Sequence, residues 1–381
     1  MCAALRARGI SVDVASTDAG LDQSSDLELE RLITYKGLPV ILFPKQLAES
    51  FKYSRPFSRW LDENVTQYDL VHIHSVFNHS CIAAARACRK HGIPYIVRPL
   101  GTLDPWSMNQ KSFRKRVFWH AGIQRMLESA NAIHYTASGE QEAVESSLNL
   151  KNGFVAPLGV NVGDGGPSDR LFGEAGGHPF VLVLSRLHPK KELETLIEAF
   201  LAAVLKPGLQ QWRLVIAGDG EPDYVNRLKE VAGNNKSDSP VLFTGWLQDE
   251  KKEAALRNAS LVALVSRQEN FGLCIAEAMA YGVPVLVSPQ VNLASDIEQS
   301  GSGWVTPIDK EQMAAVLMNV MSDEGDRRAR GRAGKELAQR RFTWEVIAQQ
   351  LTQVYDSIIQ TRVVAAGMHP QADSRQRIAQ G

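Results

Sequence analysis

The sequence predicts an α/β protein built from two domains with parallel sheets. The chain has 381 residues, which suits two domains of roughly 100–200 residues each. Short apolar strands alternate with helical stretches, a pattern typical of βα units. The alternation stops at Val160–Pro179, a segment rich in Gly with Pro and Asp, and then restarts. These observations favour two doubly wound domains joined by a linker.

The first half contains four short apolar runs that read as buried strands. Between them, the Ala-rich stretch His79–Gly92 has basic residues in its last turn and a terminal glycine, as a helix end requires. The stretch Ser112–Ser129 is a second predicted helix. The predicted strands are Ile10–Val14, Tyr68–His74, Ile93–Pro99 and Ala130–Thr136.

The second half repeats the pattern with the apolar runs FVLVL, WRLVIAG, PVLFTG, LVALVS and VPVLVS, most of them followed by a helical pattern. A long amphipathic helix is expected over Phe342–Ile359, and the polar residues after it predict disorder. We therefore expect a first domain over residues 1–162, a linker over 163–178, a second domain over 179–341, a helix over 342–360 that packs back toward the first domain, and a disordered tail over 361–381.

The start of the chain departs from this scheme. Met1–Arg8 reads as a helix that ends at Gly9, and the strand Ile10–Val14 follows. A doubly wound domain opens instead with a strand and a glycine-rich turn before its first helix. We therefore expect an apolar strand and a turn with two or more glycines to be encoded upstream of Met1.

Composition excludes several classes of protein. Lys plus Arg and Asp plus Glu number 42 each, so the net charge is zero and no bulk attraction to nucleic acid is expected. The four cysteines lack the paired spacing of zinc ligands and suit reduced thiols. No apolar run reaches the roughly 18 residues of a membrane span, and no signal peptide opens the chain. A cytoplasmic protein is the simplest expectation.

Two cations lie where ligands of such sheets bind, at the carboxyl end of a strand. Arg186 follows the run FVLVL, and Lys191 stands at the start of the next helix. In that position they can neutralise a diphosphate at a helix N-terminus. Taken alone, they suit a solvated loop better than an anion site.

Two carboxylates follow the run LVALVS in the same arrangement. Glu269 lies in the loop after the strand, and Glu277 lies inside the following helix. The first amides of that helix, from Phe271, Gly272 and Leu273, have no partner within the helix and can donate to an anion. Because carboxylates accept hydrogen bonds from neighbouring sugar hydroxyls, two of them beside an anion site indicate a nucleotide-sugar ligand. Taken alone, both glutamates also suit a solvated surface.

Several motifs occur together and in order. The stretch from Glu269 to Val285, E-N-F-G-x-x-x-x-E-A-M-A-x-G-x-P-V, resembles the E-x7-E signature of retaining glycosyltransferases of family 4, also called group 1, which have the two-domain GT-B fold. S-R-L-H-P-K-K resembles the phosphate-binding loop of this family. Ile216–Tyr224 and Phe243–Trp246 resemble two further markers of its donor domain, and Val97–Trp119 resembles a stretch of members that build bacterial polysaccharides.

The resemblance implies a role for each matched residue. Glu277 would hold the ribose hydroxyls, and Glu269 the hydroxyls of the donated sugar. Arg186 and Lys191 would bind the diphosphate and stabilise its charge as it leaves. These three residues, Glu269, Arg186 and Lys191, would be the catalytic ones, without a metal or other cofactor. The complete set expected at the donor site is Arg186, Lys191, Glu269, Asn270, Phe271, Gly272, Leu273 and Glu277.

The acceptor side matches the family less well. Many relatives carry a histidine in the loop after the strand that corresponds to Ile93–Pro99, and here that place is taken by Leu100. His74, at the end of another strand, and Asp104 are the candidates for acceptor contacts. His74 equally suits a strand-end histidine satisfied by the backbone.

The expected function is transfer of a hexose from a nucleotide-sugar to a hydroxyl of a glycan or lipid-linked acceptor. Two alternatives remain: an inactive, truncated nucleotide-sugar-binding remnant, and a nucleotide-sugar epimerase. Lys111–Leu127 mixes basic and apolar side chains, so peripheral contact with the inner face of a membrane is an alternative to an ordinary packed helix. Neither the sugar, the base nor the acceptor follows from the sequence.

Overall fold

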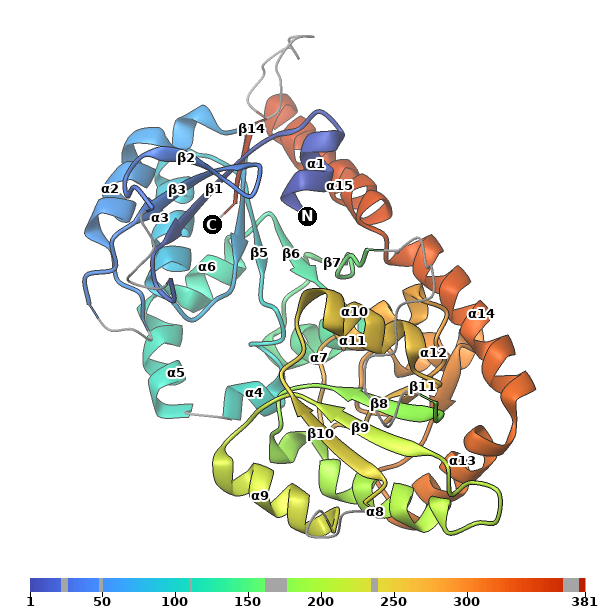
Figure 1. Ribbon diagram of the computed structural model, residues 1–381. Helices are drawn as coiled ribbons and strands as arrows, with labels where there is room; N and C mark the ends of the chain where they lie inside the picture. Colours follow the sequence, from blue (N-terminus) through green and yellow to red (C-terminus); the bar gives the residue numbers. More distant parts are fainter. Residues whose placement is uncertain are drawn as a thin grey trace. The chain divides into compact units, whose positions relative to one another are not determined.

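The computed structural model describes residues 1–21, 27–47, 51–109, 112–161, 177–233, 239–365 and 377–380. The chain divides into two compact units, which Figure 1 shows by colour. Unit 1 comprises Met1–Pro157 and Trp344–Gly381, and unit 2 comprises Leu158–Thr343. Both are layered α/β structures with helices on both faces of a largely parallel sheet, so the predicted fold class is confirmed.

Unit 1 is built on a sheet of order β2-β3-β1-β14-β4-β5-β6-β7 within the described residues. All neighbours are parallel except the hairpin of β2 and β3. The strands are β1 (Ser11–Thr17), β2 (Leu32–Tyr35), β3 (Leu38–Phe43), β4 (Leu70–His74), β5 (Tyr95–Arg98), β6 (Ala132–Tyr135), β7 (Gly153–Val155) and β14 (Arg377–Gln380). The helices are α1 (Cys2–Ala7), α2 (Arg55–Asn64), α3 (His79–His91), α4 (Pro105–Asn109), α5 (Ser112–Phe118), α6 (Gln124–Glu128), α7 (Ser138–Leu148) and α15 (Trp344–Ala365).

Unit 2 has a parallel sheet of order β10-β9-β8-β11-β12-β13. Its four central strands, β8, β9, β11 and β12, are buried almost throughout, as the interior of a parallel sheet requires. The strands are β8 (Phe180–Leu184), β9 (Arg213–Ala217), β10 (Val241–Gly245), β11 (Leu261–Leu264), β12 (Val285–Val287) and β13 (Gly303–Val305). The helices are α8 (Leu193–Val204), α9 (Pro222–Val231), α10 (Asp249–Asn258), α11 (Leu273–Ala280), α12 (Ala294–Ser300), α13 (Lys310–Ser322) and α14 (Glu324–Arg341).

The boundary between the two units differs from the predicted one. Val160 belongs to unit 2, whereas we expected the first domain to reach residue 162. The Val160 side chain is buried in the core of unit 2, and its amide donates to the carbonyl of Phe342 at 2.7 Å. Residues 163–176 of the predicted linker lie outside the described residues.

The end of the chain also differs from the expectation of a disordered tail. The helix α15 continues to Ala365, and β14 lies between β1 and β4 in the middle of the unit 1 sheet. This is the position that the expected upstream strand would take. Ile378 is fully buried beside Val12 and Leu70, with which it is in register. Burial of this apolar side chain explains how a polar segment gains an ordered strand.

One long predicted helix is divided. Instead of a single helix over Ser112–Ser129, α5 and α6 are joined by a π-helical turn in which Gly122 has a φ of 157°. Only glycine adopts this conformation readily, so the helix breaks there. Phe118, Ile123 and Leu127 pack into the unit 1 core, while Val117 is exposed. These contacts are those of a packed helix, and membrane contact stays a prediction.

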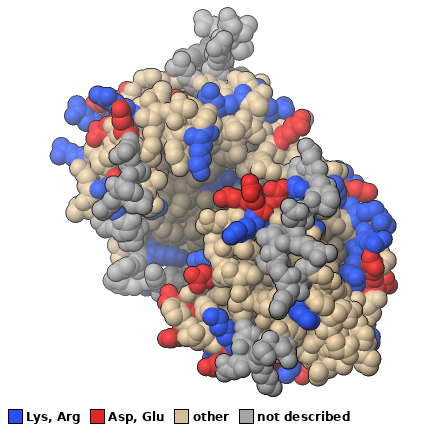
Figure 2. All heavy atoms as spheres, in the orientation of Figure 1, with Lys and Arg blue, Asp and Glu red and all other residues tan. Residues whose placement is uncertain are grey.

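Charges of both signs are mixed over the face shown in Figure 2, with a basic group along α14. Several of these arginines serve the packing of unit 2. Arg330 binds Asp326 and the carbonyl of Gly303, and Arg341 pairs with Asp296. Within the described part of the chain, no helix is long and apolar enough to cross a membrane.

A chain of buried histidines connects the unit 1 sheet to α15. His134 Nε2 lies 2.7 Å from the Ala156 carbonyl and must donate to it, so Nδ1 of His134 is an acceptor. It accepts from His72 Nε2 at 3.2 Å, and His72 Nδ1 accepts from the Tyr355 hydroxyl at 2.7 Å. These assignments require neutral imidazoles, and burial keeps both rings neutral because it lowers the pKa of each well below its usual value.

This histidine chain predicts that unit 1 loses stability on acidification. At pH values between the lowered pKa of the folded state and the unfolded value near 6.5, these histidines bind more protons in the unfolded state than in the folded state. The free energy of unfolding should therefore fall by roughly 1.4 kcal/mol per pH unit for each histidine below about pH 6.5. Urea denaturation from pH 7 to pH 5, a window above carboxylate titration, measures this slope. A stability of unit 1 that stays constant over this window would contradict the neutral network.

The placement of β14 makes a second prediction. Replacing Ile378→Asp puts a carboxylate in the sheet core, so unit 1 should lose roughly 3 kcal/mol or release the strand. Hydrogen exchange should accelerate at the amides of β1 and β4. The matched control is Val364→Asp, because Val364 is 80% exposed near the end of α15. Equal exchange in the two variants would show that β14 does not hold the sheet together.

Candidate functional site

The candidate site lies in unit 2, at the carboxyl ends of β8 and β11. The strand order reverses direction between these two neighbours, and open α/β sheets bind ligands at such a switch point. A pocket of about 490 Å³ opens there. Its lining residues are Leu184, Ser185, Arg186, Lys191, Ala217, Trp246, Leu247, Gln248, Asp249, Lys252, Leu264, Glu269, Gly272, Leu273, Cys274 and Glu277.

The loop after β8 is held by two glycines of the loop after β9. A Cβ on Gly218 would lie 1.8 Å from the carbonyl oxygen of Ser185, and one on Gly220 would lie 2.0 Å from that of Leu187. Only glycine allows this approach of two backbones. The Leu187 amide donates to the Asp219 carbonyl at 2.8 Å. The G-D-G sequence thus supports the loop that carries Arg186, whose side chain is exposed at the pocket.

The loops after β8 and β11 are tied to each other. Arg267 donates its amide to the Lys190 carbonyl at 3.0 Å, and the Ser266 hydroxyl donates to the same carbonyl at 3.1 Å. Glu269 is fixed from the other side, because its amide donates to the Gln290 carbonyl at 3.1 Å. These bonds bring Lys191 to Glu269, and the two side chains form an ion pair.

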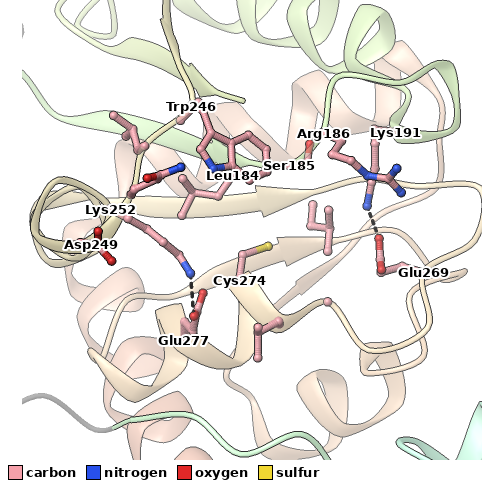
Figure 3. A pocket seen from close by; sticks show the side chains of 16 residues that line it. Leu184, Ser185, Arg186, Lys191, Trp246, Asp249, Lys252, Glu269, Cys274 and Glu277 are labelled. Atoms are coloured by element: carbon pink, nitrogen blue, oxygen red, sulfur yellow. Dashed lines mark hydrogen bonds and ion pairs between the residues drawn. The ribbon is translucent and has the colours of Figure 1, made fainter. Parts of the chain in front are cut away.

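A second ion pair lies at the other end of the pocket. Lys252, in the first turn of α10, donates to Oε1 of Glu277 in α11 at 2.7 Å. Figure 3 shows the two lysine–glutamate pairs on opposite sides of Cys274. The Glu277 and Glu269 side chains are each 20% exposed. Both carboxylates are thus largely withdrawn from water, and each has a cation beside it, as partly buried charges require.

The turn into α11 explains the glycine of the motif. Gly272 has a φ of 73°, and a Cβ there would lie 2.9 Å from Cδ2 of Leu264. The amides of Phe271, Gly272 and Leu273 donate to no described backbone group, so the start of α11 can donate to an anion. Phe271 itself is buried in the core against Phe342. Neither Phe271 nor Asn270 is among the residues that line the pocket.

One end of the pocket holds a large aromatic side chain, Trp246. Trp246 is 56% exposed and stands above Leu184, near Lys252 and Asp249 (Figure 3). Cys274 lies between the ion pairs, and burial raises the pKa of its thiol to about 12. The thiol is therefore protonated at neutral pH and is no nucleophile. Sequence reasoning missed Trp246, Lys252 and Cys274, although the first belongs to the F-T-G-W marker.

The predicted donor-site residues mostly converge. Arg186, Lys191, Glu269, Gly272, Leu273 and Glu277 line one pocket, although they come from two segments far apart in the sequence. The two acceptor-side candidates belong to unit 1. His74 is the last residue of β4, and burial lowers its pKa to about 3, so its imidazole is neutral. Asp104 directly precedes α4. The acceptor roles of both stay predictions.

Comparison with models of known protein families shows which family the chain is related to. The model of glycosyl transferases group 1 matches residues 169–337, and that of the glycosyl transferase 4-like domain matches residues 1–159. The chain belongs to the group 1 glycosyltransferases. The pocket and both ion pairs of this group 1 glycosyltransferase lie within the first of these two matches.

Curated relatives match over part of their length. Mannosylfructose-phosphate synthase of Agrobacterium fabrum is 32% identical over 45% of this chain and 39% of its own. Phosphatidyl-myo-inositol mannosyltransferase of Mycobacterium tuberculosis is 29% identical over 53% of each chain. The group 1 chain described here thus spans about half or less of the length of these relatives.

Solved structures share the fold over nearly the whole chain. Sucrose-phosphate synthase from Thermosynechococcus elongatus is 21% identical, with a TM-score of 0.75 over 94% of this chain and 91% of its own. HepE of Anabaena, in complex with UDP and glucose, is 20% identical, with a TM-score of 0.71 over 91% and 99%. At this identity the likeness shows the fold alone, and it confirms the GT-B fold expected from the sequence.

The glycine contact beside the pocket makes a third prediction. Gly220→Ala should displace Ser185–Leu187, because its Cβ meets the Leu187 backbone and not a movable side chain. We expect a loss of roughly 1–3 kcal/mol in the stability of unit 2. Hydrogen exchange should accelerate at the Leu187 amide. Gly177→Ala is the control, since a Cβ at Gly177 meets nothing within 4 Å. If the two variants melt alike, the glycine does not support the loop.

Proposed function

We propose that this chain is a retaining glycosyltransferase that moves a hexose from a nucleotide-sugar to a hydroxyl of a glycan or lipid-linked acceptor in polysaccharide biosynthesis. The observation that carries the proposal is the pocket of unit 2, where two lysine–glutamate pairs flank the free amides at the start of α11. Family membership supports it, as do the complexes of HepE with UDP and with UDP-glucose.

The charges along the pocket suit the parts of such a donor. The diphosphate would lie at Arg186, Lys191 and the amides of Gly272 and Leu273, where all donors are cationic or N–H groups. The ribose would lie at Glu277, and the base would lie beside the Trp246 ring. Glu269 would accept from hydroxyls of the donated sugar, with Lys191 between this carboxylate and the phosphate.

The chemistry breaks the bond between the anomeric carbon and the diphosphate oxygen, which leaves with the electron pair. Arg186 and Lys191 would stabilise the negative charge that develops on this leaving group. The acceptor hydroxyl would attack from the same face, so configuration is retained, and its proton would pass to the leaving phosphate. This route requires no protein nucleophile. No metal ion is expected to take part, since the two cations supply the positive charge.

The acceptor would be bound by unit 1, with His74 and Asp104 as candidate contacts. A neutral His74 can accept or donate a hydrogen bond to a hydroxyl. The proposed place of action is the cytoplasm or the inner face of the membrane, where lipid-linked acceptors are presented. Contact through residues 111–127 would then bring the enzyme to its acceptor.

Binding tests the proposal first. Thermal-shift measurements with UDP-, GDP- and ADP-hexoses should identify one nucleotide class that stabilises the chain, and radiolabelled donor should then show release or transfer of the sugar. Retention is tested by NMR of the product's anomeric configuration. Stabilisation by a donor without release or transfer would favour the binding remnant, and recovery of an epimerised donor would favour the epimerase.

Two substitutions separate binding from chemistry. Lys191→Ala should lower turnover by about 100-fold or more, because the leaving-group charge is largest in the transition state. Its effect on donor affinity should be smaller. Glu277→Ala should weaken donor binding by roughly 1–3 kcal/mol, the scale of a hydrogen bond to a charged group. Both are measured by calorimetry and initial rates, with exposed Lys206→Ala as control. Parental behaviour of both variants would place the site elsewhere.

A further inference from the structure

The ion pair between Lys252 and Glu277 leaves one carboxylate oxygen without a partner. Oε1 of Glu277 accepts from Lys252 at 2.7 Å. Oε2 is shielded from water, and no group among the described residues donates a hydrogen bond to it. An oxygen of an ionised carboxylate in such a place is costly unless it receives a hydrogen bond. The molecule that fills the pocket is therefore expected to bring the missing donor.

The surroundings of Glu277 limit what this donor can be. The neighbouring pocket residues are Leu273, whose side chain is apolar, and Cys274, whose thiol is only a weak donor. Arg186 and Lys191 lie on the far side of Cys274 (Figure 3). A phosphate would be repelled by the carboxylate, and a second cation would meet the Lys252 ammonium. A neutral hydroxyl satisfies the oxygen without either conflict.

Lys252 determines which oxygen of Glu277 is available. Its backbone belongs to α10, whose residues Ala254, Ala255 and Leu256 are buried in unit 2, so the base of the side chain is held in place. The ammonium binds Oε1 and leaves Oε2 as the oxygen that still lacks a donor. Without Lys252 the carboxylate can rotate, and both oxygens then compete for the ligand or for water.

We propose that Lys252 is a specificity-determining residue that makes the pocket select a ribonucleotide over a deoxyribonucleotide. It acts by positioning Glu277, so that Oε2 accepts a hydrogen bond from one hydroxyl of the ribose. This inference rests on the proposed function, because it requires that a nucleotide occupies the pocket. It adds a positioning residue outside the E-x7-E motif and a discrimination that can be measured without turnover.

The experiment compares nucleoside diphosphates that differ by one hydroxyl. The full chain is titrated calorimetrically with UDP, GDP and ADP, and the tightest binder is then compared with its 2′-deoxy and 3′-deoxy analogues. The parent should bind the ribonucleotide about tenfold or more tightly than one of the two analogues. In Lys252→Met this ratio should fall to about twofold, mainly because the ribonucleotide binds more weakly. Lys252→Arg should restore most of the ratio.

Two further proteins test whether Lys252 acts through Glu277. Lys251→Met is the matched control, because Lys251 is the exposed neighbour in the same helical turn, and it should leave the ratio unchanged. In a Glu277→Ala background, Lys252→Met should not change the ratio further, since residues that act as a unit are not additive.

The outcomes separate this inference from the proposed function. If the parent binds no nucleoside diphosphate, both are overturned. If it binds one but does not distinguish the deoxy analogues, only the role of Oε2 is overturned. If Lys252→Met weakens all three ligands by the same factor, Lys252 serves the fold or contacts the base, and the positioning role is wrong. A tighter ribonucleotide complex in Lys252→Met overturns it as well.

Discussion

The direct pairing of β8 with β11 is the constraint on which the pocket of unit 2 depends. These parallel strands are far apart in the sequence, and their pairing puts the loops after them at one edge of the sheet. The backbone of Lys190 then bonds to Ser266 and Arg267, and this contact sets Lys191 beside Glu269. Gly218 and Gly220 complete the support from β9, because a side chain at either place would collide with the loop.

The charges in the pocket include two lysine–glutamate pairs. Two glutamates withdrawn from water next to a proposed phosphate site would repel the ligand if they stood alone. Each is paired with a lysine that comes from a different element, α10 in one case and the loop after β8 in the other. Under the proposed function, the paired carboxylates would accept hydrogen bonds from hydroxyls, and Arg186 and the first amides of α11 would bind the anion. The pocket thus offers acceptors and donors in separate places.

Unit 1 depends on a different kind of interaction. Its sheet is joined to α15 by neutral histidines whose donors and acceptors are satisfied in sequence, from Tyr355 to His72 to His134. The strand β14 lies within this sheet, and its Ile378 packs with residues of α1 and α15. The two ends of the chain therefore contribute to one core, which explains why the last described residues form a strand despite their polar sequence.

Local patterns in the sequence determined much of this protein. Apolar runs predicted most strands, because buried strands of parallel sheets are continuously hydrophobic. Motif spacing predicted six of the pocket residues: Arg186, Lys191, Glu269, Gly272, Leu273 and Glu277. Only the tertiary structure added Lys252, which comes from a helix without a motif and reaches Glu277 through the packing of α10 on α11. Likewise, β14 depends on pairing with strands that are distant in the sequence. The β2–β3 hairpin turns at Lys36–Gly37, both with positive φ, without a common hairpin signal. The roles of these residues depend on contacts between segments that are distant in the sequence. Local periodicity reports only on neighbours along the chain, so it cannot predict such contacts.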